Sequence, residues 1–226
     1  MNPGLKESGF RVEESILPES ECERLAAGLS SSFGGRGRAG ARNLMRHPSV
    51  ASLASDERLL GIARRALGVG GAMPYRATLF EKSERASWLV AWHQDTALPL
   101  EGRFEAEGWG QWSRKAGVTY ARAPSWALAR VVALRVHLDA SARENGPLKV
   151  IPGSHRMGVM ASEDVAAFAR AGGHVECLVG RGGVLAMSPL LVHASSKSSG
   201  GGPRRVLHLE YSDALELAPG VRLAIA

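Results

Sequence analysis

Cysteine is scarce in this chain of 226 residues, and long apolar runs are absent. The two cysteines, Cys22 and Cys177, are far apart in the sequence. This excludes a disulfide framework and a cysteine-built metal site, and we expect both to be reduced thiols of a cytoplasmic protein. The longest apolar run, from Val184 to Val192, is interrupted by Ser188 and Pro189 and is too short to span a membrane.

Lysine is also rare, since only five of the 28 basic residues are lysine. The formal charge is +6 and the sequence pI is about 9.8, but the arginines are scattered, with no basic tail and no interleaving with aromatic residues. We therefore expect no nucleic-acid partner and no membrane partner. Residues Met1 to Glu7 lack the apolar core of a signal peptide, which agrees with the expected cytoplasmic location.

The length fits a single domain, 1–226, with one sizeable core. Its N-terminal part, about 18–68, reads as helical. Pro18 and the acidic residues after it suit the first turn of a helix that ends before Gly34. A second helical stretch is expected over about 48–67, with glycines after it. Residues 30–40 are rich in Gly, Ser and Arg and predict a loop, which acts either as a linker or as a lid.

From Pro74 onward the apolar period changes toward two, which is typical of strands. Expected strands cover 10–12, 74–82, 89–95, 130–138, 148–151, 175–179, 184–187, 190–193 and 206–212, with one more helix over about 162–170. Many short strands after a helical start predict a mainly β fold, a β-sandwich or jelly roll with helices packed on one side.

The stretch 97–127 predicts a long irregular insertion that contains Trp109, Trp112 and Tyr120. Its length and aromatic content fit a loop folded over something else. That something is either the edge of the core or a substrate, and the sequence leaves both open.

The residues with the clearest chemistry are His93 and Asp95, at the end of an expected strand. Side chains of a strand alternate between its faces, so these two should point the same way. They supply two-thirds of the set of two histidines and one carboxylate that leaves open positions on ferrous iron. His193 is the best candidate for the third ligand, because it ends an apolar strand beside a Ser-rich loop.

Arg204 lies eleven residues after His193 and begins the next expected strand. An arginine there could hold a carboxylate by two parallel hydrogen bonds. An iron oxygenase that uses 2-oxoglutarate needs such a cation for the distal carboxylate of that cosubstrate.

Taken together, Trp92–Asp95, the block from Asn145 to Arg156 (NGPLKVIPGSHR), His193 and Arg204 resemble the phytanoyl-CoA dioxygenase family over about 10–211. These are iron(II)/2-oxoglutarate oxygenases. The resemblance implies a double-stranded β-helix, cupin-like, with N-terminal helices packed on one sheet.

The resemblance also implies roles for individual residues. His93, Asp95 and His193 would be the iron ligands and Arg204 the clamp for 2-oxoglutarate. Lys82 matches a family lysine and is a further cosubstrate contact.

The strand before Lys82 presents Arg76 and Thr78 on a face that in relatives borders cosubstrate and substrate. Arg76 is therefore a candidate cosubstrate contact and Thr78 a candidate substrate contact.

The implied activity uses O2 and hydroxylates a small organic or acyl substrate, with formation of succinate and CO2. Related halogenases have a small residue where this chain has Asp95, so hydroxylation is expected over halogenation. Neither the substrate nor the oligomeric state follows from the sequence.

Arg135 shares a strand face with Ala133 and His137 that should line the barrel interior. A buried, unpaired guanidinium is costly. Either a structural carboxylate pairs with Arg135, or Arg135 holds an anionic group of the substrate or cosubstrate. With Arg135, Trp109 and Trp112 are the expected places of substrate contact.

The remaining histidines have less specific readings. His155 should hold its loop by hydrogen bonds, His47 and His174 should lie at the surface, and His208 should be a satisfied core histidine. Two rival functions stay open: a jelly-roll metal-binding protein without catalysis, and a nucleic-acid-modifying oxygenase of the same fold.

Overall fold

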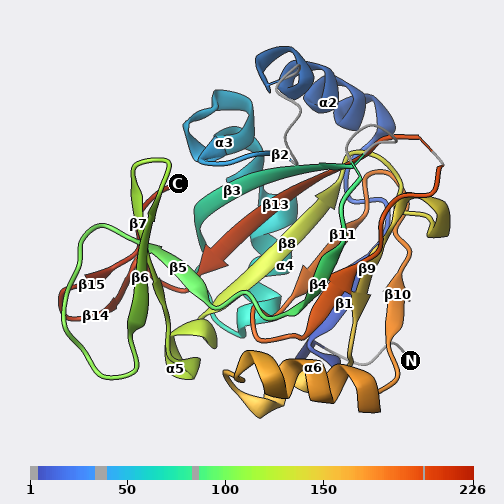
Figure 1. The fold of residues 1–226 in the computed structure, drawn as a ribbon. Helices are drawn as coiled ribbons and strands as arrows, with labels where there is room; N and C mark the ends of the chain where they lie inside the picture. Colours follow the sequence, from blue (N-terminus) through green and yellow to red (C-terminus); the bar gives the residue numbers. More distant parts are fainter. Residues whose placement is uncertain (1–4, 34–39, 83–86, 201) are drawn as a thin grey trace.

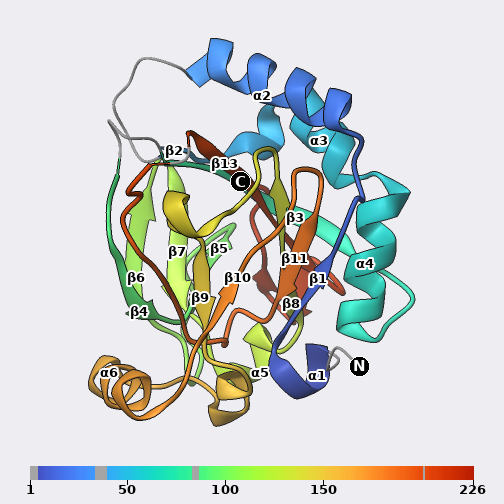
Figure 2. The same ribbon diagram turned by 90° about the vertical axis from the view of Figure 1, so that its right-hand side faces the viewer.

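Two antiparallel sheets face each other in the computed structural model, which describes residues 5–33, 40–82, 87–200 and 202–226 (Figures 1 and 2). The large sheet has the order β1-β11-β8-β13-β3-β2 and the small sheet the order β10-β9-β12-β4. The strands of the large sheet are β1 (Phe10–Glu13), β2 (Gly40–Ala41), β3 (Met73–Lys82), β8 (Val131–His137), β11 (Val184–Met187) and β13 (Arg204–Ser212). Those of the small sheet are β4 (Val90–His93), β9 (Leu148–Val150), β10 (Val175–Cys177) and β12 (His193–Ser195). The expected mainly β, double-stranded β-helix architecture is confirmed.

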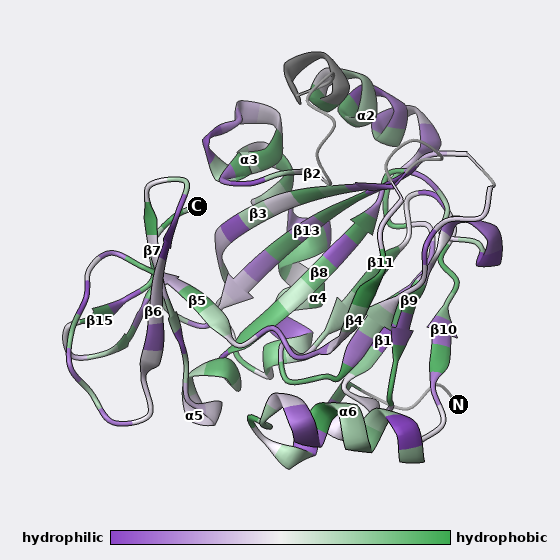
Figure 3. Cartoon of the chain, viewed as in Figure 1, coloured by the Kyte–Doolittle hydropathy of each residue, from purple (hydrophilic) through white to green (hydrophobic). Residues whose placement is uncertain are grey.

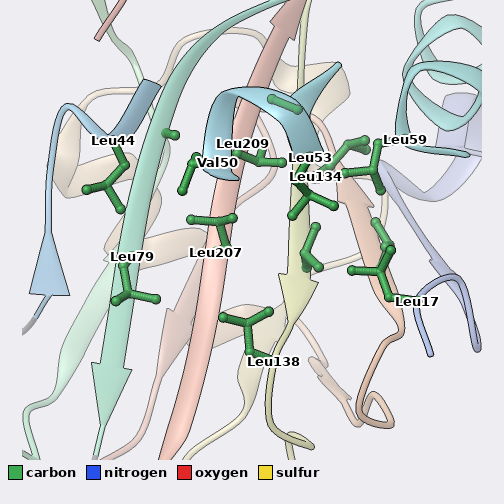
Figure 4. Packing of buried hydrophobic residues seen from close by; sticks show 14 of the residues in the cluster. Leu17, Leu44, Val50, Leu53, Leu59, Leu79, Leu134, Leu138, Leu207 and Leu209 are labelled. Atoms are coloured by element: carbon green, nitrogen blue, oxygen red, sulfur yellow. The ribbon is translucent and has the colours of Figure 1, made fainter. Parts of the chain in front are cut away.

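The N-terminal helices cover the outer face of the large sheet, as Figure 2 shows. They are α2 (Glu19–Phe33), α3 (Pro48–Ala54) and α4 (Glu57–Leu67), after the single turn α1 (Leu5–Ser8). In Figure 4, Leu53 and Leu59 of the helices pack with Leu134 and Leu209 of the sheet, all of them buried. Leu134 and Leu209 are followed along their strands by Arg135 and Glu210, so this part of the opposite face of the large sheet is polar, whereas its β11 part carries the apolar Leu185 and Met187.

The small sheet has its own cover, α6 (Ser162–Ala171). Val165 of this helix packs against Ile151 and Val192 in a separate apolar cluster. Both outer faces are therefore shielded. Between the sheets, an apolar cluster that includes Leu185 and Val150 occupies one part, and the polar side chains described below occupy another. Within the described part of the chain, no helix has both the length and the apolar character needed to cross a membrane.

The stretch 48–67 forms two helices where one was expected. Asp56 interrupts it in an extended conformation and accepts a hydrogen bond from the backbone N–H of Arg58 at 2.8 Å. This N-cap starts α4, and Gly68 ends it with φ of 72°. The glycine-rich loop expected over 30–40 is only partly described: α2 continues to Phe33, and 34–39 lie outside the described residues.

The insertion forms a separate three-stranded sheet, so the expectation of an irregular loop over 97–127 was wrong. Three strands pair in the order β5-β7-β6: β5 (Ala97–Leu100), β6 (Gly110–Lys115) and β7 (Val118–Arg122). The short helix α5 (Ser125–Leu128) and the hairpin β14 (Glu216–Ala218) and β15 (Val221–Arg222) lie beside them (Figure 1). Gln111, at the irregularity within β6, and Ala116, in the turn from β6 to β7, adopt positive φ of 47° and 49°, which their residue types do not signal.

Strand register brings the polar residues of the large sheet together. β13 lies between β3 and β8, so Arg204 is opposite Lys82, and His208 is flanked by Thr78 and Arg135. Figure 3 shows the hydrophilic and hydrophobic segments alternating along these strands. Since the leucines of the same strands face the helices, these polar side chains face the small sheet.

Candidate metal centre

His93, Asp95 and His193 converge in the space between the sheets. One donor atom from each lies within 4.8 Å of the other two. The two histidines are direct partners in the pairing of β4 with β12, and their ring centroids are 4.1 Å apart. Each Nε2 is 3.5 Å from an oxygen of Asp95. The ligand set that the resemblance implied is therefore assembled in space.

Asp95 reaches this position by a different route from the one expected. The strand ends at His93, so Asp95 is not held by alternation along one strand. Its backbone N–H donates to the carbonyl of Pro189 at 2.9 Å, just before the strand that carries His193. A contact distant in sequence thus fixes the carboxylate.

Backbone carbonyls fix the tautomer of both imidazoles. Nδ1 of His93 lies 2.8 Å from the carbonyl oxygen of Ala91, and Nδ1 of His193 lies 2.8 Å from that of Leu191. A carbonyl oxygen only accepts, so each Nδ1 carries the proton and each Nε2 presents its lone pair toward Asp95. Such bonds orient metal-ligating histidines and raise their basicity.

Burial and charge act on each of the three groups. Burial would lower the pKa of His93, but the hydrogen bond to Asp95 and its charge outweigh burial and raise that pKa, so a cation replaces a proton there. Burial lowers the pKa of His193 to about 4, against the attraction of Asp95. Burial alone would raise the pKa of Asp95, but the two histidines hold it well below its usual value. The side chains of His93 and Asp95 are 39% and 36% exposed and that of His193 is 4% exposed, so the open side of the cluster is reachable from solvent. Neutral imidazoles and an ionised carboxylate are the donors that non-haem iron(II) takes.

Gln94, between two of the ligands, is a positioning residue that the sequence did not single out. It is buried, and its Nε2 donates to the carbonyls of Gly158 and Leu190 at 2.8 and 2.7 Å. Its Oε1 accepts from the N–H of Met160 at 2.9 Å. Gln94 therefore ties the His93–Asp95 segment to two loops.

The NGP…PGSH block supports the third ligand. The hydroxyl of Ser154 accepts a hydrogen bond from Val192 N–H at 2.8 Å, next to His193. Gly146 has φ of 69°, and a Cβ there would lie 2.4 Å from the carbonyl oxygen of Ser196, so only glycine lets the two loops pack this closely. His155 holds its loop as expected, with Nε2 3.2 Å from the carbonyl oxygen of Lys6.

Arg204 is buried, at 3% exposure, in the same interior. Its Nε and Nη1 have no hydrogen-bond partner in the part of the chain that the structure describes. Burial and the nearby Arg135 lower its pKa, yet a guanidinium stays protonated at neutral pH. A buried, unpaired cation of this kind is destabilising unless an anion joins it. The distal carboxylate of 2-oxoglutarate fits this requirement, and the donor set of His93, Asp95 and His193 fits iron(II).

Lys82 lies opposite Arg204 and is also buried. Its Nζ donates to the hydroxyl of Ser195 at 2.8 Å and to the carbonyl of Ser196, and it lies 5.4 Å from the ring centroid of Trp88. An ammonium group has three donors, so one remains for a ligand beside Arg204. Burial, Arg204 and Arg135 lower the pKa of Lys82 to about 8.

The lowered pKa of Lys82 makes a prediction about stability and pH. An unfolded lysine titrates near 10.4, so between about pH 8 and 10 the unfolded state holds the proton more tightly than the folded state. Stability of the metal-free protein should therefore rise with pH in this window, by up to about 1.4 kcal/mol per pH unit, relative to Lys82→Met. Urea unfolding at pH 7.5, 8.5 and 9.5 measures the difference, and parallel pH profiles for the two proteins would contradict it.

Arg76 already has a carboxylate partner. Its Nη1 lies 3.2 Å from Oε1 of Glu210, and its guanidinium carbon lies 5.3 Å from the ring centroid of Tyr120 in the insertion. Thr78 lies two residues along β3 with its buried hydroxyl unpaired among the described residues. Contact of Arg76 with cosubstrate and of Thr78 with substrate both stay predictions.

Arg135 lies in the barrel interior, as expected, but the carboxylate partner considered for it is not found within the described ranges. Its Nη1 is 3.2 Å from Nδ1 of His208, and its guanidinium carbon is 5.4 Å from the ring centroid of Phe80. His208 is buried and satisfied at both nitrogens, since Nε2 lies 3.1 Å from Oε1 of Glu210. Nothing in the sequence indicated that Glu210 would be the carboxylate bonded to His208 and Arg76.

Trp109 and Trp112 belong to an aromatic cluster of the insertion. Both rings contact Phe104 edge to face, with centroids 5.2 Å apart in each case. They pack against an apolar cluster that includes Leu98 and Leu100. Of the two alternatives for the insertion, the structure shows it packed over the edge of the core. Contact of either tryptophan with a substrate stays a prediction.

A double-stranded β-helix that gathers two histidines and a carboxylate between its sheets, within reach of a buried unpaired arginine, is the architecture of the non-haem iron(II) oxygenases. The family model described as phytanoyl-CoA dioxygenase (PhyH) matches residues 5–206. The chain therefore belongs to the phytanoyl-CoA dioxygenase family, which confirms the resemblance seen in the sequence. The sequence matches none of the curated proteins with which it was compared.

Solved structures share the fold at low sequence identity. AviO1 from Streptomyces viridochromogenes Tue57 superposes with a TM-score of 0.68 and 23% identity, covering 92% of this chain and 91% of that chain. EctD from S. alaskensis with 2-oxoglutarate and 5-hydroxyectoine gives 0.68 and 24%, covering 92% and 73%. The non-heme alpha ketoglutarate dependent epimerase SnoN from nogalamycin biosynthesis gives 0.67 and 16%, covering 93% and 80%.

Proposed function

We propose that this protein is an iron(II)/2-oxoglutarate-dependent dioxygenase that hydroxylates a small organic or acyl substrate, with formation of succinate and CO2. The observation that carries the proposal is Arg204: a buried guanidinium with unpaired donors shares one interior with His93, Asp95 and His193. A metal site alone would not need this cation, whereas a dicarboxylate cosubstrate does. EctD, of similar fold, has been solved with bound Fe and with 2-oxoglutarate.

Each residue of the chain has a defined task in this proposal. His93, Asp95 and His193 hold iron(II), which together with 2-oxoglutarate and O2 supplies the oxidising power to remove hydrogen from a carbon atom. Arg204 orients the cosubstrate by its distal carboxylate, and Lys82 adds a donor beside it. The two sheets exclude water from the buried end of this interior, which strengthens those electrostatic contacts.

Within this iron and 2-oxoglutarate chemistry, we propose hydroxylation as the specific outcome of the reaction. Asp95 supplies a carboxylate where a halogenase of this type would leave room for chloride, which supports oxygen transfer over halogen transfer. The fold also serves other outcomes, because the similar SnoN and SnoK structures are described as an epimerase and a carbocyclase. A cytoplasmic location and a small-molecule substrate complete the proposal.

Anaerobic titration of the metal-free protein tests the chemistry without a known substrate. Iron(II) followed by 2-oxoglutarate should produce the visible charge-transfer band of a chelated keto acid, and admission of O2 should then convert 2-oxoglutarate to succinate. Protein loaded with zinc(II) is the control and should show neither. Iron that binds without the band would reduce the protein to a metal-binding jelly roll.

A further inference from the structure

We propose that Arg135 is a second carboxylate-binding residue of the same interior, separate from Arg204 and held in place by His208 and Glu210. This inference rests on the proposed function, because it concerns the ligands of the iron and 2-oxoglutarate site. The carboxylate comes either from the keto-acid end of the cosubstrate or from the substrate, and the experiment below separates the two.

The charge of Arg135 is not neutralised by the protein. The side chain is 6% exposed, its Nε has no partner, and it forms no ion pair with any residue in the described ranges. The two nearby carboxylates are engaged elsewhere: Asp95 with the two histidines, and Glu210 with Arg76. An uncompensated buried cation costs several kcal/mol, so its retention indicates an anion that arrives from solution.

Arg204 does not remove this need. One 2-oxoglutarate molecule brings one distal carboxylate, and Arg204 with Lys82 already faces it with two cations. Arg135 lies on β8, beside β13, and is opposite His208, which is four residues along β13 from Arg204. Its guanidinium therefore faces the same interior as the pair, at a different position along the sheet.

A chain of hydrogen bonds fixes the direction of this guanidinium. Arginine only donates, so Nδ1 of His208 must accept from Nη1 of Arg135, and the proton of His208 lies on Nε2. Nε2 donates in turn to Glu210, which also accepts from the hydroxyl of Tyr75 at 2.9 Å. With one Nη held by His208 and the ring of Phe80 against the guanidinium, the free Nε edge is preorganised for a carboxylate.

Keto acids of different length separate the two arginines. Iron(II)-loaded wild type, Arg135→Gln, Arg135→Lys and Arg204→Gln are titrated anaerobically with 2-oxoglutarate and with pyruvate, which lacks the distal carboxylate. The charge-transfer band reports affinity and band position. Arg204→Gln should weaken 2-oxoglutarate but not pyruvate. If Arg135 holds the keto-acid carboxylate, Arg135→Gln should weaken both by about 10- to 100-fold and shift the band, with a smaller effect for Arg135→Lys.

If the carboxylate belongs to the substrate, both keto acids should bind Arg135→Gln within about twofold of wild type. Benzoate and hexanoate should then perturb the band of the wild-type iron(II)–2-oxoglutarate complex, benzamide and hexanamide should not, and Arg135→Gln should lose the distinction. Unchanged keto-acid binding together with no preference for carboxylates over amides would overturn the inference. The proposed function fails separately, by the absence of any band in wild type.

Arg130→Gln is the matched control for loss of a partly buried arginine. Arg130 immediately precedes β8, and its guanidinium pairs with Asp213 at 2.8 Å, outside the interior. This variant should lose stability and bind both keto acids like wild type. Arg135→Lys, which keeps the charge but not the planar fork, preserves the test should the glutamine variant fold poorly.

Discussion

Arg204→Gln should weaken 2-oxoglutarate binding by about 100-fold or more while iron(II) binding stays close to that of wild type. Removal of one member of a buried, hydrogen-bonded charge pair costs about 2–5 kcal/mol, partly because the other charge is left unpaired. Arg204 has two donors available for the distal carboxylate, whereas the metal ligands are elsewhere in the interior. Anaerobic titration of the charge-transfer band gives the cosubstrate affinity, and metal analysis gives the iron content.

The same residue should have the opposite effect on the stability of the ligand-free protein. Replacement of a buried, uncompensated charge by an apolar residue of similar size is often neutral or stabilising by 1–4 kcal/mol. Ligand-free Arg204→Leu should therefore unfold at an equal or higher urea concentration than wild type. Addition of 2-oxoglutarate to the iron(II)-loaded proteins should then stabilise the wild type further and the variant much less.

Arg205→Gln is the control for both measurements. Arg205 is the next residue on β13, but its Nε and Nη2 pair with the two oxygens of Asp139 at 2.6 and 2.8 Å. Its replacement should lower stability and leave cosubstrate affinity unchanged. An Arg204→Gln protein that binds 2-oxoglutarate as tightly as wild type would show that the distal carboxylate is held elsewhere, with Lys82 as the next candidate.

Local pattern predicted the parts of the site that local structure controls. The alternation along 130–138 correctly put Arg135 and His137 on the face opposite Leu134, because the side-chain period of a strand is fixed at two. His93 does end a strand, β4, but the strand expected over 190–193 was wrong: His193 begins β12, so for this ligand only the family motif gave the right reason. Asp56 could have revealed the helix break within 48–67, since an Asp followed by an apolar, amphipathic segment is an N-cap signal.

Other features depend on contacts that no local pattern contains. Asp95 lies outside its expected strand because its N–H bonds to Pro189, 94 residues further along the chain. The sequence left two alternatives for the partner of Arg135 and did not indicate His208, because His208 becomes its neighbour only through the register of β13 against β8. The insertion was expected to be a loop, since ordinary residues adopt positive φ at its irregularities, Gln111 within β6 and Ala116 in the turn after it. These are the places where tertiary structure overrides propensity.

Asp95→Asn should reduce iron(II) affinity by more than about 100-fold and abolish the charge-transfer band at stoichiometric iron. The asparagine keeps the size of the side chain and one oxygen but loses the negative charge. Two neutral imidazoles would then hold a dication in a partly buried site with no charge compensation. Loss of groups that merely orient metal ligands already costs 10- to 100-fold, so loss of the charged ligand itself should cost at least as much.

The geometry of the cluster makes this substitution informative. The imidazoles are oriented by the carbonyls of Ala91 and Leu191 and not by Asp95, so they should keep their positions in the variant. Their structure and the fold should survive, and circular dichroism would confirm it. His47→Asn is the control, since His47 directly precedes α3 on the outer side of the large sheet, with Nδ1 2.9 Å from the hydroxyl of Ser49, and should leave iron affinity unchanged. If Asp95→Asn retained wild-type iron affinity, Asp95 would not be an iron ligand, and the proposed set of two histidines and a carboxylate would be wrong.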